Sequence, residues 1–127
     1  QKAIMKRTIL TIFVLVLATH LGAKEPLERS YSICLDQAGP INNSVVFGCS
    51  SQVEEDASEQ IAELLLNLKA VLEETDLETL SQGQQAWEIY VKQQCNLQGR
   101  YVGSPMHAYC PMTKAIDRVN ELKLLLE

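Results

Sequence analysis

Four cysteines are the residues of this chain whose type and spacing most directly suggest chemistry. They fall into two pairs, Cys34 with Cys49 and Cys95 with Cys110, and each pair encloses fourteen residues. A four-cysteine zinc site usually brings its ligands in close pairs, about two to four residues apart. A thioredoxin-like redox centre needs two cysteines separated by about two residues. Neither spacing occurs, so we expect no metal site and no dithiol redox site.

Nucleophilic catalysis by a cysteine would need a histidine as its base. His107 is the only histidine after residue 20, and no suitable carboxylate accompanies it locally. The sequence also has no pair of metal-binding histidines, no phosphate-cradling loop, no nucleophile elbow and no EF-hand calcium loop. We therefore expect a protein that is not an enzyme, with no catalytic residue and no cofactor.

The even number of cysteines favours two disulfides if the chain is exported to an oxidising compartment. Four cysteines allow three pairings, and the spacing alone does not choose between them. We expect Cys34–Cys49 and Cys95–Cys110, because each bridge would tie the end of one helix to the start of the next across a Gly/Pro turn. In the chain-entropy model a loop of this length gains about 3 kcal/mol per bridge.

Export is predicted by the first residues. Met5-Lys6-Arg7 is a basic start, and the apolar run that follows ends in small residues, with a predicted cut after Ala23. Residues 1–4 precede the expected start methionine and are treated as extraneous to the signal peptide. The apolar core over residues 9–18 is shorter than the ~20 residues that span a bilayer, and an uncleaved anchor is the alternative. We therefore expect a signal peptide over residues 1–23 and one domain over 24–127.

The domain is strongly acidic. Residues 24–127 hold all 16 acidic residues and 8 of the 11 basic ones, since Lys2, Lys6 and Arg7 precede the cut, so the net charge is −8. Nucleic acid and an anionic membrane surface would both repel such a protein. We expect a cationic protein partner, no nucleic acid and no stable membrane insertion after cleavage. Solubility alone is the simpler explanation of the charge.

Apolar periodicity predicts an all-α domain of three to four helices. A first helix is expected over residues 25–37 and a second over 43–74, with the side chains of Asn42 and its neighbours available as caps. The third should open at a capping box, Thr75 to Glu78, and close at Gly99. The last should start near Pro111. No strand-like alternation competes with these helices.

The predicted core lies along the second and last helices. Each of these helices has one apolar face whose residues recur at steps of 3 and 4. On the second helix the face consists of Val46, Cys49, Val53, Ala57, Ile61, Leu64, Leu68 and Val71. On the last helix it consists of Met112, Ile116, Val119, Leu122 and Leu126. On the third helix, Trp87 is expected in the core rather than as a ligand platform. Gln84 and Asn67 lie at or near core positions, where a polar group needs a hydrogen-bond partner.

Two surfaces are candidates for binding a partner. The stretch 95–110 is expected to be an exposed loop held by its disulfide and displaying Arg100, Tyr101, His107 and Tyr109. A constrained loop with tyrosine and arginine suits recognition, because little entropy is lost on binding. The second surface is an acidic stripe of Glu55, Glu59 and Glu63 on the second helix. The alternatives are side chains that pack over the helix ends and a merely solvated face.

Several of these residues, taken in order, resemble the lysozyme-inhibitor LprI-like family of small exported bacterial proteins. That family has a leading cysteine pair, a Leu-Asn on a long helix, Gln-x-x-Trp before a third cysteine, a glycine-rich turn, a fourth cysteine and an Arg-x-x-x-Leu end. The resemblance covers residues 34–122. The matching residues here are Cys34, Cys49, Leu66, Asn67, Gln84, Ala86, Trp87, Cys95, Gly103, Ser104, Cys110, Arg118 and Leu122.

The resemblance implies a periplasmic or secreted bacterial protein that binds lysozyme and inhibits it by occluding its cleft, without catalysis. It also implies structural roles for the motif residues Leu66, Asn67, Gln84, Trp87, Gly103 and Arg118. Animal-type lysozymes are strongly basic, which suits an acidic partner. The alternative is a structural or stress-related protein of the cell envelope that has no lysozyme activity.

Overall fold

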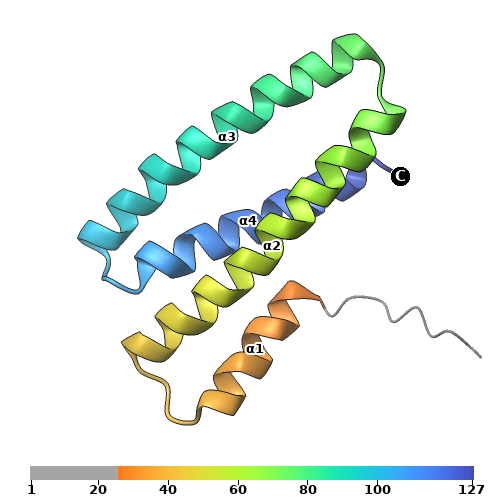
Figure 1. Ribbon diagram of the computed structural model, residues 1–127. Coiled ribbons are helices and arrows are strands. Elements are labelled where there is room, and N and C mark those ends of the chain that lie inside the picture. The colour runs from red at the N-terminus through yellow and green to blue at the C-terminus, as the bar shows by residue number, and fades with distance from the viewer. Residues whose placement is uncertain (1–25) are drawn as a thin grey trace, which may run out of the picture.

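The computed structural model describes residues 26–127, and this part of the chain consists of four helices without a strand (Figure 1). They are α1 (Leu27–Ala38), α2 (Asn43–Val71), α3 (Glu74–Tyr101) and α4 (Met106–Leu124). The predicted all-α, disulfide-stapled class is therefore confirmed. The signal peptide expected over residues 1–23 lies outside the described residues. None of the four helices is long and apolar enough to cross a membrane.

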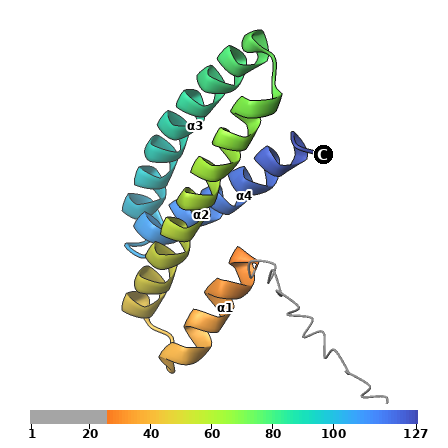
Figure 2. The same ribbon diagram turned by 45° about the vertical axis from the view of Figure 1, so that its right-hand side comes forward.

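Helix α4 is the central element of the domain. It packs extensively along α2 and also against α3, while α1 packs against α2 (Figures 1 and 2). Helices α2 and α3 run in opposite directions from their shared corner, yet they contact each other only sparsely. The two long helices are thus held together mainly through α4, which leaves their facing sides partly open.

The core lies mainly between α2 and α4, as the apolar periodicity predicted. The completely buried side chains include Leu68 on α2 and Leu122 on α4, and Leu27 of α1 joins the same cluster. Trp87 is partly buried and packs against this cluster from α3. The ends of the predicted stripes are exceptions, because Val71 and Leu126 are exposed.

Local capping explains where α2 begins. The side-chain oxygen of Asn42 accepts a hydrogen bond of 2.9 Å from the backbone N–H of Val45, which satisfies one of the free donors of the first turn. The helix ends at Val71, three residues earlier than predicted, because Leu72 takes an extended conformation (ψ 151°) and turns back into the core. The connection to α3 is therefore very short.

The predicted capping box at the start of α3 is wrong. The helix begins at Glu74, with Glu73 as its N-cap residue, so Thr75 already lies inside the first turn. The Thr79 hydroxyl donates to the carbonyl of Thr75 within the helix. Glu74 and Asp76 instead place negative charge beside the free N–H groups of this terminus.

The predicted boundaries around the second disulfide are also wrong. Helix α3 does not close at Gly99 but continues to Tyr101, and α4 begins at Met106, so that Pro111 lies inside it. The expected long loop over 95–110 is therefore only a short turn, residues 102–105. The structure places Cys95 and Cys110 within regular helices, where both side chains are buried.

Both expected disulfides are present. Cys34 of α1 is bonded to Cys49 of α2, and Cys95 of α3 is bonded to Cys110 of α4, with Cα–Cα distances of 5.7 and 5.4 Å. No cysteine among the described residues is free. Each bridge joins consecutive helices close to their connecting turn. The α1–α2 and α3–α4 corners are therefore covalently fixed, and the α2–α3 corner has no bridge.

Candidate functional site

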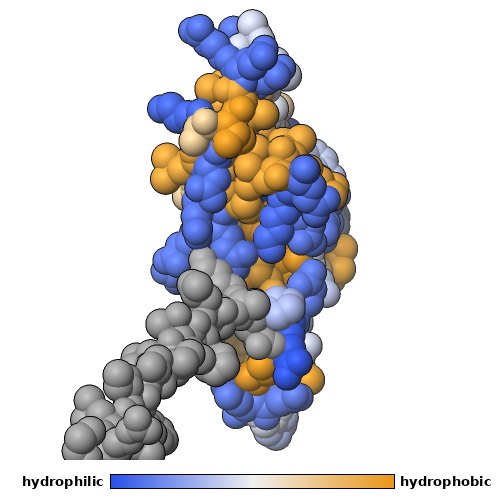
Figure 3. Space-filling model, turned by 90° about the vertical axis from the view of Figure 1, so that its right-hand side faces the viewer, coloured by the Kyte–Doolittle hydropathy of each residue, from blue (hydrophilic) through white to orange (hydrophobic). Residues whose placement is uncertain are grey.

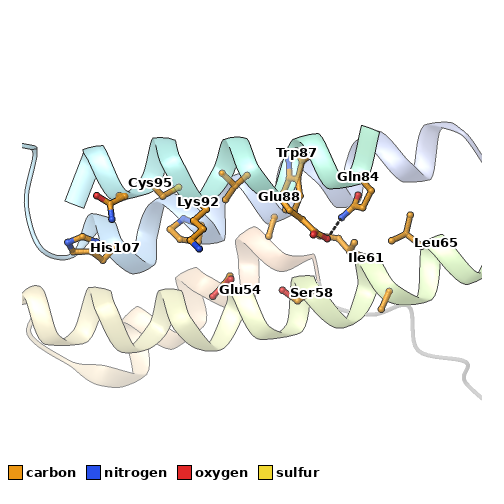
Figure 4. A pocket seen from close by; sticks show the side chains of 15 residues that line it. Glu54, Ser58, Ile61, Leu65, Gln84, Trp87, Glu88, Lys92, Cys95 and His107 are labelled. Carbon is orange, nitrogen blue, oxygen red and sulfur yellow. Dashed lines mark hydrogen bonds between the residues drawn. The ribbon is translucent and has the colours of Figure 1, made fainter. Parts of the chain in front are cut away.

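An open groove runs between α2 and α3, with α4 as its floor. Its volume is about 590 Å³. It exists because the two long helices rest on α4 rather than on each other. Figure 4 shows side chains from α2 and α3 converging on this space from its two walls. The groove is a concave feature from which a binding site can be built.

The lining of the groove combines apolar and polar side chains from both walls. Ile61 and Leu65 of α2 and Trp87 and Val91 of α3 supply apolar surface along its length. Polar side chains follow the lips and the end nearest the α3–α4 turn: they are Glu54, Ser58, Gln84, Glu88, Lys92, Asn96 and His107. An apolar strip bordered by polar side chains suits binding of another macromolecule or of an amphiphilic ligand.

The groove continues toward the α2–α3 corner. A second hollow of about 360 Å³ shares Leu65 and Gln84 with it and is lined further by Leu77 and Leu80. This end is more apolar than the other. The two hollows are neighbours between α2 and α3, and we refer to them together as the furrow.

Gln84, Trp87 and Arg118, three residues expected to have structural roles, lie together beside the groove. The Nε of Arg118 donates a hydrogen bond of 2.9 Å to the side-chain oxygen of the buried Gln84, and its guanidinium lies 6.0 Å from the centre of the Trp87 ring. Arg118 also pairs with Glu121 at 3.0 Å, and Gln84 donates to Glu88 at 3.4 Å. This network ties α3 to α4.

Of the four residues predicted to be exposed for binding on the stretch 95–110, only Arg100 and Tyr101 project beside the α3–α4 turn. Tyr101 is 78% exposed and Val102 is 73% exposed, and the guanidinium of Arg100 lies 5.6 Å from the centre of the Tyr101 ring. Arg100 itself is exposed. Arg100, Tyr101 and Val102 thus form a projecting tip, which we call the α3 tip.

The other two residues expected on this display lie elsewhere. Tyr109 is partly buried, with its ring 5.8 Å from that of Tyr31, so it packs α4 against α1. His107 is exposed but lines the groove and lies directly over Gly99. A Cβ on Gly99 would collide with the imidazole ring, so this glycine permits the close approach of the two helices. Gly103 lies in the turn itself, where it is partly buried.

The acidic stripe is present on α2 but does not face the groove. Glu55, Glu59 and Glu63 are all exposed, on the side of α2 away from its buried face. The α2 stripe and the α3 tip therefore belong to different helices. The structure does not bring them into a single site.

Two further motif residues lie outside the core. Asn67, which was expected at or near a core position, is exposed, and Leu66 is 69% exposed. The helical period explains this, because Leu68, one position further along, takes the buried place on α2. The sequence analysis did not single out Ser58 and Ala62. These two small residues, four positions apart on α2, line the groove.

No group of three or more histidine, cysteine, aspartate or glutamate side chains within residues 26–127 could hold a metal ion. Apart from the disulfide cysteines, the polar residues of the groove form no nucleophile–base pair among the hydrogen bonds found there.

Comparison with known proteins adds no relative: no family model, no curated protein and no solved structure matches the chain. The class of the protein is therefore defined by its own structure, as a small all-α domain whose helices are joined by two disulfides. Disulfides of this kind are typical of oxidising compartments.

Proposed function

We propose that this chain is a non-catalytic binding protein that inhibits an animal-type lysozyme by placing the α3 tip in its cleft. The observation that carries the proposal is the tip itself. Arg100, Tyr101 and Val102 project at a corner that the Cys95–Cys110 bridge fixes. A fixed, exposed Tyr-Arg pair is the kind of anchor that dominates protein interfaces, because little entropy is lost on binding.

The chemistry of the tip matches that of the cleft. Glycosidases of this class cleave their substrate with two carboxyl groups that flank the scissile bond. A guanidinium presents planar donors that match carboxylate geometry. Between residues 89 and 116 the chain has basic side chains but no Asp or Glu, so no carboxylate of this stretch competes for Arg100. We expect Arg100 to pair with the cleft carboxylates while Tyr101 packs beside it.

The negative charge of the domain outside the α3 tip complements the positive charge of a basic lysozyme. Residues 24–127 carry a net charge of −8, and the exposed α2 stripe of Glu55, Glu59 and Glu63 is one concentration of it. Charge of opposite sign steers encounter and raises the association rate more than it raises the final affinity. In this proposal the stripe accelerates association and the α3 tip holds the complex.

The proposed location is the bacterial periplasm or the exterior of the cell. The two disulfides and the signal-like sequence over residues 1–23 support it. This is also where an inhibitor would meet a lysozyme that attacks the cell wall.

The experiment compares two double variants of the oxidised chain in a cell-wall lysis assay with animal-type lysozyme. Arg100→Ala with Tyr101→Ser removes the anchor. Tyr90→Ser with Lys114→Ala removes a similar pair of a tyrosine and a cation elsewhere, in which Nζ of the partly buried Lys114 lies 5.4 Å from the centre of the Tyr90 ring. We expect the first to weaken inhibition about 30-fold, as a hot spot of roughly 2 kcal/mol would, and the second to leave it unchanged. Equal effects would reject the α3 tip as the inhibitory element.

A structural or stress-related envelope protein is the second candidate. The observation that favours it is the apolar furrow between α2 and α3, which an inhibitor acting through the α3 tip would not use. Retention of an envelope component on the immobilised chain, with lysozyme fully active in its presence, would support this candidate over the first.

A further inference from the structure

We infer that the furrow between α2 and α3 is a docking site for a cationic amphipathic helix of a partner protein. This site is separate from the α3 tip and does not depend on lysozyme inhibition. The furrow consists of the two neighbouring hollows that share Leu65 and Gln84. Each of its parts points to a helix as the occupant.

The shape of the furrow corresponds to one helix missing from a bundle. Its walls are two antiparallel helices that contact each other only sparsely, and its floor is a third helix, α4. On α2 the lining runs from Glu54 to Lys69, which corresponds to about 22 Å of helix at 1.5 Å per residue. A partner helix of roughly 15 residues would fill that length.

The lining provides the contacts that a helix needs. Ile61, Leu65, Leu80, Trp87 and Val91 form the apolar strip into which side chains at i, i+3, i+4 and i+7 would fit. On the floor and the α2 lip the residues are small: Ala115 lies on α4, and Ser58 and Ala62 lie on α2. Small side chains allow a helix backbone to approach closely, as the usual interaxial distances of 8–10 Å require.

The charge of the two wall helices favours a cationic helix. The lining itself is balanced, with Glu54 and Glu88 against Lys69 and Lys92. The helices that carry it are acidic as a whole: α2 has five acidic residues and one lysine, and α3 has four acidic and two basic residues. This surplus of negative charge on both walls favours lysine or arginine on the flanks of the incoming helix and disfavours acidic ones.

Trp87 makes the test direct, because it is the only tryptophan of the chain and it lines the furrow. The probe is a tryptophan-free 15-residue helical peptide, about the length estimated above, with leucines on one face and lysines on the other. Its counterpart carries glutamates in place of the lysines. We expect a saturable blue shift of Trp87 fluorescence with the lysine peptide and none with the glutamate peptide.

A matched pair of variants assigns the binding to the furrow. Ala62→Phe puts a large side chain on the lip, whereas Ala70→Phe makes the same change at another exposed position of α2, outside the furrow. We expect Ala62→Phe to weaken peptide binding about tenfold or more through steric overlap, and Ala70→Phe to leave it unchanged. Lysozyme inhibition should be the same in both variants, which separates this site from the α3 tip.

Three outcomes would overturn the inference. One is equal binding of the two peptides, and another is an equal effect of the two variants. The third is a concentration-dependent dimer, seen by sedimentation equilibrium, whose dissociation shifts Trp87 fluorescence to the red, because then a second copy would fill the furrow.

Discussion

The imidazole of His107 lies against the backbone of Gly99, so closely that no side chain could be added to that glycine without moving the ring. Gly99 is buried within α3, and His107 lies in the first turn of α4. The contact lies beside the Cys95–Cys110 bridge, at the corner from which the α3 tip projects.

Replacement of Gly99 by Ala is expected to depend on His107. In a helix interior Gly→Ala normally stabilises by about 0.5–1 kcal/mol. At Gly99 we expect this gain to vanish or reverse in the wild-type background, because the imidazole must leave its place. It should reappear in a His107→Ala background. Chemical denaturation of the four chains of this double-mutant cycle measures the coupling.

Gly83 is the matched control for that cycle. It lies in the same helix, is exposed, and would meet no atom within 4 Å of an added Cβ. Gly83→Ala should therefore stabilise the chain regardless of residue 107. Coupling of Gly83 to His107 as large as that of Gly99 would contradict the role given to the contact.

The hydrogen bond between Arg118 and Gln84 is expected to contribute measurably to stability. Arg118→Ala leaves the oxygen of the buried Gln84 without its 2.9 Å donor, which should cost about 1–3 kcal/mol. Glu121→Ala removes only the exposed partner of Arg118, and its cost should stay below about 1 kcal/mol. Equal losses in urea unfolding would show that the bond to Gln84 is not the important one.

The second disulfide is expected to matter for both stability and inhibition. Cys95→Ala with Cys110→Ala should lower the free energy of unfolding by about 2–4 kcal/mol and loosen the α3 tip. The same change at Cys34 and Cys49 should cost a similar amount but leave the tip in place. Inhibition assayed well below both melting temperatures should weaken only in the first case, and an equal loss would argue against a preorganised tip.

Charge reversal on α2 should act through the association rate. Glu55→Lys with Glu59→Lys alters two exposed positions of the α2 stripe and should slow association with lysozyme roughly tenfold at low salt. Glu28→Lys with Asp36→Lys changes the net charge equally but on α1. Association is measured by stopped flow. If both pairs of substitutions slow association equally, the net charge controls the rate and the position of the α2 stripe does not.

Much of the fold could be predicted because its signals are local. The spacing of Val53, Ala57, Ile61 and Leu68 marks one helical face, and that face is buried. The pairing of each cysteine with its nearer neighbour followed from the short turns between helices. The boundaries near Gly99 and Pro111 were wrong, since a glycine and a proline were taken as helix ends although both lie inside helices.

The candidate sites were harder to predict, because they depend on how helices sit relative to one another. The apolar stripe on α3 predicts that Trp87 is covered, but not that α2 stands away from it and leaves a furrow. The partner of Gln84 lies 34 residues further along the chain, beyond any local pattern. The tip residues Arg100 and Tyr101 were found from their types, whereas Tyr109 packs instead against Tyr31.

Inhibition of lysozyme by this chain is tested most directly by titration of oxidised residues 24–127 into animal-type lysozyme acting on bacterial cell walls. It is run at low and at physiological salt, because opposite net charges are screened over about 8 Å at physiological ionic strength. We expect stoichiometric inhibition that weakens as salt rises, with no turnover by the chain itself. Full lysozyme activity at both salt concentrations, with the helical fold and both disulfides verified, would contradict it.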